Sequence, residues 1–216
     1  MTIVEDHGLI AQTVAAALTA RGTAVAVIDP AHTNDDLFDA VTATEPDLVL
    51  LDLDFGGGRT GLPLVEPLAA ADVRVVMVTG VSDPVRRAEC VAAGAIGVLS
   101  KSGSFDELVG AIERAVDQGT LLSPAERNDH LALLREHRDG ERRRSAPFEA
   151  LTQREAEVLG QLMHGRSVDE VARAAHVTVA TVRTQVRAIL TKLGVTSQLA
   201  ATAKARDAGW DPPLAT

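Results

Sequence analysis

The stretch Leu48-Val49-Leu50-Leu51-Asp52-Leu53-Asp54 sets the fold of the N-terminal half of the chain. Its unbroken run of large aliphatic residues is typical of a strand buried on both faces of a parallel sheet, and the run ends in a carboxylate. Shorter apolar runs with the same character occur at residues 3–4, 24–28, 73–78 and 97–99. We therefore expect five strands, of which this stretch is the third.

Helical patterns separate these apolar runs. Pro84 suits a first helical position after Asp83, and Ser104 with Glu107 forms a capping-box pattern at the start of another helix. Strands that alternate with helices predict an α/β domain with a five-stranded, doubly wound parallel sheet. The expected helices cover residues 8–21, 33–44, 61–70, 84–93 and 105–117.

The composition is that of a globular protein without disulfides. The chain has 216 residues, of which 46% are hydrophobic and 2% aromatic, so its cores must be aliphatic. One cysteine, Cys90, excludes an internal disulfide. Apolar runs fall short of the ~18 residues of a membrane span, and Glu5 and Asp6 stand where a signal peptide would be basic. We expect a cytoplasmic protein without a membrane partner. The first strand begins so near Met1 that it is either short or preceded by further residues.

Charge is distributed unevenly along the chain, whose net charge is −9. Residues 1–122 hold 18 acidic and 7 basic residues, residues 123–149 hold 6 of each, and residues 150–216 hold 6 acidic and 8 basic residues. One explanation is an acidic module joined to a mildly basic one, and the other is ordinary scatter. If the chain binds a polyanion, we expect the C-terminal part to do so.

Polar residues follow the expected strands where those strands end. Glu5 and Asp6 follow the first strand, Asp52 ends the third, Thr79 ends the fourth and Lys101 follows the fifth. Ligands of open parallel sheets bind at this edge, so the five side chains should converge. Clustered carboxylates repel one another unless a cation lies between them, and Mg²⁺ prefers such oxygen ligands. Asp52 could then attack a phosphoryl group whose oxygens Thr79 and Lys101 hold.

Two of these residues also have simpler explanations when each is taken alone. Asp52 could be a helix cap, and Lys101 could be one more surface lysine. Their placement after successive strands favours a shared site.

Residues 3–118 resemble the receiver domains of response regulators. The acidic pair, the aspartate, the threonine and the lysine come in the family's order, with 46 residues from Asp6 to Asp52 and 22 from Thr79 to Lys101. The resemblance implies that a histidine kinase phosphorylates Asp52, and that Thr79 and Lys101 bind the phosphoryl oxygens. The Mg²⁺ ligands that it implies are Glu5, Asp6, Asp52 and the backbone carbonyl of Asp54.

Two features depart from that family. The family usually has a Met-Pro-Gly-type turn after the phosphoacceptor, whereas residues 54–61 read DFGGGRTG. Three consecutive glycines make this loop conformationally permissive. The family often places an aromatic residue three positions before the lysine, and here that residue is Val98. Any switch must therefore use the backbone or another surface.

Asp52 and Asp54 also form an Asp-x-Asp pattern that resembles haloacid-dehalogenase-type phosphatases. In those enzymes an acidic pair follows the lysine. Here the pair Glu5 and Asp6 precedes Asp52, and no suitable pair follows Lys101 at a strand end. We therefore expect a regulator rather than an enzyme.

The composition changes over residues 121–148. Ser123 and Glu126 mark a helix start, and a highly charged stretch with scattered leucines follows. Gly140 and the arginines at 142–144 come next. We expect a helical linker that ends in a flexible segment, with arginines that are either solvated or in contact with a DNA backbone.

Residues 149–216 carry helical patterns without strands. Capping boxes begin at Thr152 and Ser167, and Thr178 and Thr196 are suited to cap two more helices. A short second helix, a tight turn and a longer third helix predict a helix-turn-helix that binds the major groove of double-stranded DNA. The four expected helices cover residues 153–164, 168–175, 179–192 and 196–208.

Residues 150–208 closely resemble the LuxR-type helix-turn-helix of NarL/FixJ response regulators. The matching segments are residues 151–159, 180–183 and 192–195, whereas Val168 replaces a usual asparagine. The resemblance implies that the fourth helix mediates self-association. The DNA-facing residues that it implies are Arg183 and Lys192 for phosphates, Thr184 and Arg187 for base edges, and Gln185.

These features predict an α/β receiver domain at residues 1–120, a helical, charged linker at 121–148 and an all-α, LuxR-type, four-helix DNA-binding domain at 149–216. We expect a DNA-binding response regulator of a two-component system. A histidine kinase would phosphorylate it, and it would bind DNA as a homodimer through the receiver, the C-terminal helix or both. The alternative is a phosphorylation-independent regulator whose receiver serves dimerisation or ligand sensing.

Overall fold

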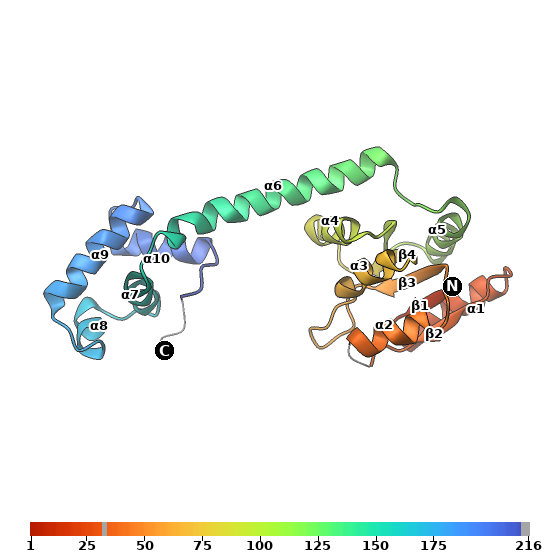
Figure 1. The fold of residues 1–216 in the computed structure, drawn as a ribbon, viewed down its shortest axis with the longest axis horizontal. Helices are drawn as coiled ribbons and strands as arrows, with labels where there is room; N and C mark the ends of the chain where they lie inside the picture. Colours follow the sequence, from red (N-terminus) through yellow and green to blue (C-terminus); the bar gives the residue numbers. More distant parts are fainter. Residues whose placement is uncertain (32–33, 213–216) are drawn as a thin grey trace. The chain divides into compact units, whose positions relative to one another are not determined.

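The computed structural model of the protein describes residues 1–31 and 34–212. It divides into two compact units, Met1–Arg135 and Glu136–Thr216 (Figure 1). The division falls inside one long helix, α6 (Pro124–Glu149). Within the described residues, every helix is too short or too polar to cross a membrane.

The first unit contains a five-stranded parallel sheet with the strand order β2-β1-β3-β4-β5. The central strand β3 is buried along its whole length, as its aliphatic run predicts. Parallel pairing places Asp52 beside Val78, and Thr79 beside Ser100, at one edge of the sheet. The strands are β1 (Thr2–Val4), β2 (Ala26–Ile28), β3 (Leu48–Asp52), β4 (Arg74–Thr79) and β5 (Gly97–Ser100).

Helices cover both faces of this sheet. On one face, Leu18 of α1 and Ile112 of α5 pack against Ile3 and Leu50 of the sheet. The other face is covered by α2, α3 and α4. This doubly wound arrangement is the one that the sequence predicts. The helices are α1 (Gly8–Thr19), α2 (Asn34–Thr42), α3 (Leu62–Ala70), α4 (Pro84–Ala93) and α5 (Phe105–Gln118).

The long helix α6 differs from the expected linker. We expected a flexible segment after Gly140, but the helix continues through the arginines at 142–144 and through Pro147 to Glu149. Phe148 explains this continuation, because its side chain is only 4% exposed and belongs to the core of the second unit. Its ring stacks on Trp210 with a centroid separation of 5.2 Å. Burial of this aromatic ring stabilises the last turn of α6, although that turn contains Pro147.

The second unit is helical and is built around one aliphatic core. Leu159, Val171, Val182 and Ile189 are buried in it. The last helix begins later than expected: its N-cap is Ser197, whose hydroxyl accepts from the backbone N–H of Ala200 at 3.1 Å, so Thr196 is not the cap. After α6 come α7 (Gln153–Met163), α8 (Val168–Ala174), α9 (Val179–Leu193) and α10 (Gln198–Asp207).

Candidate functional site

An acidic cluster lies at the carboxyl edge of the sheet, where β1, β3 and β5 end. Glu5 and Asp52 are 6% and 3% exposed. The ammonium of Lys101 lies 2.7 Å from Glu5 Oε2 and 2.8 Å from Asp52 Oδ2. One oxygen each from Glu5, Asp6 and Asp52, together with one ring nitrogen of His7, lie within 4.8 Å of one another. The structure therefore brings together both acidic positions, the aspartate and the lysine.

The ionisation of Asp52 reflects this enclosure. Burial raises the pKa of the Asp52 carboxyl to about 6, and the negative charge of Glu5 adds to the rise. Lys101 and the backbone N–H of Asp54 act in the opposite direction. At neutral pH the carboxyl is therefore mostly ionised, although the fold carries a free-energy cost for its charge.

Thr79 is at the end of β4 and is 1% exposed. Its hydroxyl accepts a hydrogen bond from the backbone N–H of Val81 at 3.0 Å. The backbone N–H of Lys101 donates to the Thr79 carbonyl at 2.8 Å, which ties the ends of the two strands together. A Cβ atom at the next residue, Gly80, would meet nothing within 4 Å, so there is open space beside this edge.

The loop after Asp52 has a fixed part and a glycine-rich part. The backbone N–H of Asp54 donates to Asp52 Oδ1 at 3.2 Å, and that of Gly61 donates to the Leu53 carbonyl at 3.1 Å. Residues 56–58 are glycines with φ of 69°, 59° and 79°, a left-handed conformation that other residues rarely adopt. A Cβ atom at Gly61 would lie 2.3 Å from the Asp52 carbonyl oxygen. Close approach therefore requires glycine at 61, and backbone conformation favours it at 56–58.

Two arginines of α4 contact this region, and the sequence analysis did not identify them. Arg86 binds the Asp54 carboxylate through nitrogen–oxygen contacts of 2.8 and 3.3 Å. Arg87 donates to the carbonyl of Val98 at 2.8 Å. Val98 itself is buried in the core where the related family often has an aromatic residue. Helix α4 is therefore tied both to the loop after Asp52 and to β5.

The three carboxylates of the acidic cluster fit a hard divalent cation such as Mg²⁺. Glu5, Asp6 and Asp52 provide carboxylate oxygens on the same side of the sheet edge. Oxygen ligands of this kind, completed by water, are what Mg²⁺ selects in proteins.

In the second unit, α8 and α9 form a helix-turn-helix. The turn passes through His176, whose φ of 54° is left-handed, and Thr178 caps α9 through the backbone N–H of Thr181 at 3.1 Å. Among the expected DNA-facing residues, the exposed ones are Arg183, Thr184, Arg187 and Lys192, whereas Gln185 is half-buried.

Two of these expected DNA-facing residues are less available than the others, one because it is partly buried and the other because it is paired. Oε1 of Gln185 is buried and has no hydrogen-bond partner within the described part of the chain. The ammonium of Lys192 lies 2.6 Å from Oε2 of Glu155, the residue that completes the capping box of α7. Arg183, Thr184 and Arg187 are therefore the expected DNA-facing residues that are exposed and not paired with another helix among the described residues.

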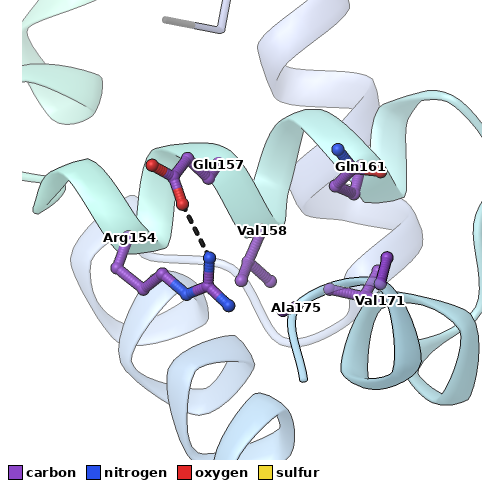
Figure 2. A pocket seen from close by; sticks show the side chains of 7 residues that line it. Arg154, Glu157, Val158, Gln161, Val171 and Ala175 are labelled. Carbon is purple, nitrogen blue, oxygen red and sulfur yellow. Dashed lines mark hydrogen bonds and ion pairs between the residues drawn. The ribbon is translucent and has the colours of Figure 1, made fainter. Parts of the chain in front are cut away.

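A hollow of about 150 Å³ lies between α7 and α8 (Figure 2). Its two charged residues, Arg154 and Glu157, form an ion pair of 2.8 Å with each other. The hollow therefore offers an ionic ligand no unmatched charge. Its other lining residues are Val158, Gln161, Val171, Ala174 and Ala175.

Comparison with known proteins agrees with both units. Residues 1–113 match the response regulator receiver domain family, and residues 149–205 match the luxR family of bacterial regulatory proteins. A nitrate/nitrite response regulator protein homolog from Haemophilus influenzae is 31% identical over 93% of this chain and 92% of its own. The transcriptional regulatory protein LnrK from Bacillus subtilis is 30% identical over 89% of this chain and 90% of its own. A solved RcsB–DNA complex aligns with 95% of this chain and 96% of its own, at 19% identity and a TM-score of 0.47.

The fold and the acidic edge define a receiver followed by a helix-turn-helix. The chain belongs to the LuxR-type, DNA-binding response regulators of two-component systems.

Proposed function

We propose that Asp52 accepts a phosphoryl group from a histidine kinase and that this modification controls DNA binding by α9. The observation that carries the proposal is the contact of Asp52 with Lys101 at 2.8 Å inside a buried acidic cluster. A carboxylate that is 3% exposed and paired with an ammonium is shielded from bulk water. Such a group is suited to act as a nucleophile that a specific donor must reach.

Each neighbour of Asp52 has a role in that transfer. A carboxylate oxygen of Asp52 forms the new O–P bond while the P–N bond of the phosphohistidine donor breaks. Lys101 already lies against the Asp52 carboxylate, so it can hold a phosphoryl oxygen there, and Thr79 can donate its hydroxyl to another. Mg²⁺, held by Glu5, Asp6, Asp52 and the Asp54 carbonyl, would supply positive charge that offsets the negative charge of the phosphoryl group.

The DNA interface is proposed on α9, which would lie in the major groove. Arg183 is assigned to a phosphate, and Thr184 and Arg187 to base edges, because all three are exposed on one helix. Gln185 and Lys192 are weaker candidates for DNA contact, because Gln185 is half-buried and Lys192 is paired with Glu155.

The regulator is proposed to act as a homodimer, since a two-fold protein matches a palindromic operator. Helix α10 is the first candidate for pairing, because Leu199 is 79% exposed and Ala203 leaves room for close approach. The proposed domain bounds are residues 1–120 for the receiver, 121–148 for the linker and 149–216 for the DNA-binding domain. The proposed location of the protein is the cytoplasm.

Labelling of the full chain tests the phosphoacceptor. With a small acyl-phosphate donor and Mg²⁺, the wild type should gain the mass of one phosphoryl group, and Asp52→Asn should gain none. Asp106→Asn, on an exposed carboxylate of α5, is the matched control and should label fully. Equal labelling of the wild type and Asp52→Asn would reject the assignment.

Operator binding tests the recognition surface. Arg187→Ala should cost about 1–3 kcal/mol and relax the preference at one base pair. Arg183→Ala should weaken binding to all sequences alike and lower the salt slope by about 1. Arg114→Ala, in the receiver, is the control. Unchanged binding by both α9 variants would place the interface elsewhere.

A second candidate function is a regulator whose DNA binding does not depend on phosphorylation. Val98 favours it, because a valine cannot swing with Thr79 as a large aromatic ring can. DNA affinity that stays the same before and after complete labelling of Asp52 would select this alternative.

A further inference from the structure

His7 lies beside the acidic cluster but has no role in the function proposed above. It follows Asp6 directly and is the residue before the first turn of α1. Its Nδ1 lies 2.7 Å from Asp6 Oδ1 and 3.1 Å from Glu5 Oε1, although 65% of the side chain is exposed. Nδ1 therefore faces the two carboxylates, while most of the side chain stays exposed to solvent.

Helix capping does not explain this orientation. His7 occupies the N-cap position of α1, yet its side chain makes no cap hydrogen bond. Its backbone N–H instead donates to Glu5 Oε1 at 3.1 Å, which fixes the main chain next to the cluster. The backbone thus holds the ring nitrogen near the carboxylates.

The donor set is consequently mixed rather than purely carboxylate. A ring nitrogen of His7 is the one nitrogen in the group of four ligand atoms that lie within 4.8 Å of one another. Mg²⁺ favours oxygen ligands and gains little from imidazole. First-row transition ions bind imidazole more strongly, and Mn²⁺ also accepts carboxylates readily.

We propose that His7 supplies a nitrogen ligand to the metal site of the receiver, so that the site binds Mn²⁺ in preference to Mg²⁺. The proposal rests on the same site as the proposed function and concerns which ion it selects. The competing explanation is that His7 only forms an exposed ion pair with Glu5 and Asp6. In that case, removing the imidazole would not weaken Mn²⁺ binding more than Mg²⁺ binding.

Metal titration of the full chain separates these explanations. Calorimetry should show Mn²⁺ binding at least tenfold tighter than Mg²⁺ in the wild type. His7→Ala should weaken Mn²⁺ binding by fivefold or more and change Mg²⁺ binding by less than twofold. His137→Ala, which removes a histidine from α6, is the matched control and should change neither.

Pulsed electron paramagnetic resonance of bound Mn²⁺ gives a direct readout of the ligand. The wild type and His137→Ala should show coupling to a ¹⁴N nucleus, and His7→Ala should lose it. The inference is overturned if the wild type lacks this coupling, if His7→Ala weakens both ions alike, or if neither ion binds. The proposed function fails separately, by the absence of donor-dependent labelling at Asp52, so the two failures can be told apart.

Discussion

The guanidinium of Arg86 in α4 binds the carboxylate of Asp54, two residues after Asp52, through two nitrogen–oxygen contacts. This pair joins a helix of the receiver to the loop that follows the phosphoacceptor. The backbone N–H of the same Asp54 donates to the Asp52 carboxylate. A change at Asp52 therefore has a short connection to α4 that requires no aromatic side chain at Val98.

Replacing Arg86 tests how far the pair orders the glycine-rich loop. Arg86→Met should lower the free energy of unfolding by less than about 1 kcal/mol, because both side chains are partly exposed. It should nevertheless speed hydrogen exchange at the Asp54 amide severalfold. Arg21→Met breaks a remote ion pair with Glu113 and should leave that amide unchanged. Equal exchange in all three proteins would show that the loop is held by other contacts.

Gly61 and Gly57 should respond differently to alanine. At Gly61 the new methyl group would lie 2.3 Å from the Asp52 carbonyl oxygen and 3.0 Å from Leu51 and Phe55 side-chain atoms, so we expect a loss of more than about 2 kcal/mol. At Gly57 the methyl group meets nothing within 4 Å, and only the left-handed φ costs about 1 kcal/mol. Denaturant unfolding compares the two. A larger loss for Gly57→Ala would contradict the close packing around Gly61.

Asp52→Asn should stabilise the metal-free receiver in a pH-dependent way. The pKa of Asp52 in the folded state is about 6, above its ordinary value of 3.8. Between pH 3.8 and pH 6 the native state therefore binds a proton that the unfolded state has lost. The stability associated with that proton is lost as the pH rises through about 6. The variant should therefore gain up to about 3 kcal/mol over the wild type at pH 7.5, and little at pH 4. Thermal unfolding in a chelator measures this gain, and an equal gain at both pH values would exclude charge burial as its source.

Lys192→Met should act on stability more than on DNA contacts. Burial alone would raise the pKa of Glu155, but Lys192 and Thr152 outweigh it and lower the pKa. The pair therefore stabilises the fold at pH values above about 4.5, the ordinary pKa of a glutamate. This contribution disappears as the pH falls through the lowered pKa of Glu155 in the folded state. We expect a loss of about 1 kcal/mol at pH 7, measured by denaturant unfolding, and an unchanged salt slope of DNA binding. A slope reduced by about 1 would instead show a phosphate contact.

Local signals in the sequence predicted the fold well. The aliphatic run before Asp52 became the central strand. The capping boxes at Ser104, Thr152 and Ser167 all formed with both reciprocal hydrogen bonds, because a capping box needs only residues three apart. The linker was harder to predict. Gly140 is a local signal for a helix end, whereas the burial of Phe148, which keeps the helix continuous, depends on a core formed by residues distant in the sequence.

Side-chain pairs between distant elements could not be predicted in the same way. Arg86 is 32 residues from Asp54, and Lys192 is 37 residues from Glu155. A long cation can reach many surface carboxylates, so its partner depends on how the elements pack. His7 is different, because its position directly after the acidic pair was visible in the sequence and was a usable signal.

The carboxylate of Glu155 has two partners in the fold. It accepts from the backbone N–H of Thr152 at the start of α7, and it binds the ammonium of Lys192 near the end of α9. Residues 155 and 192 should therefore change together, if at all, as related regulators diverge. In the contacts described, the side chains of three residues of α9 bind no residue of another helix. These residues are Arg183, Thr184 and Arg187. A duplicated gene could thus acquire a new operator by substitutions on one face of α9, while the residues that hold the domain together stay the same.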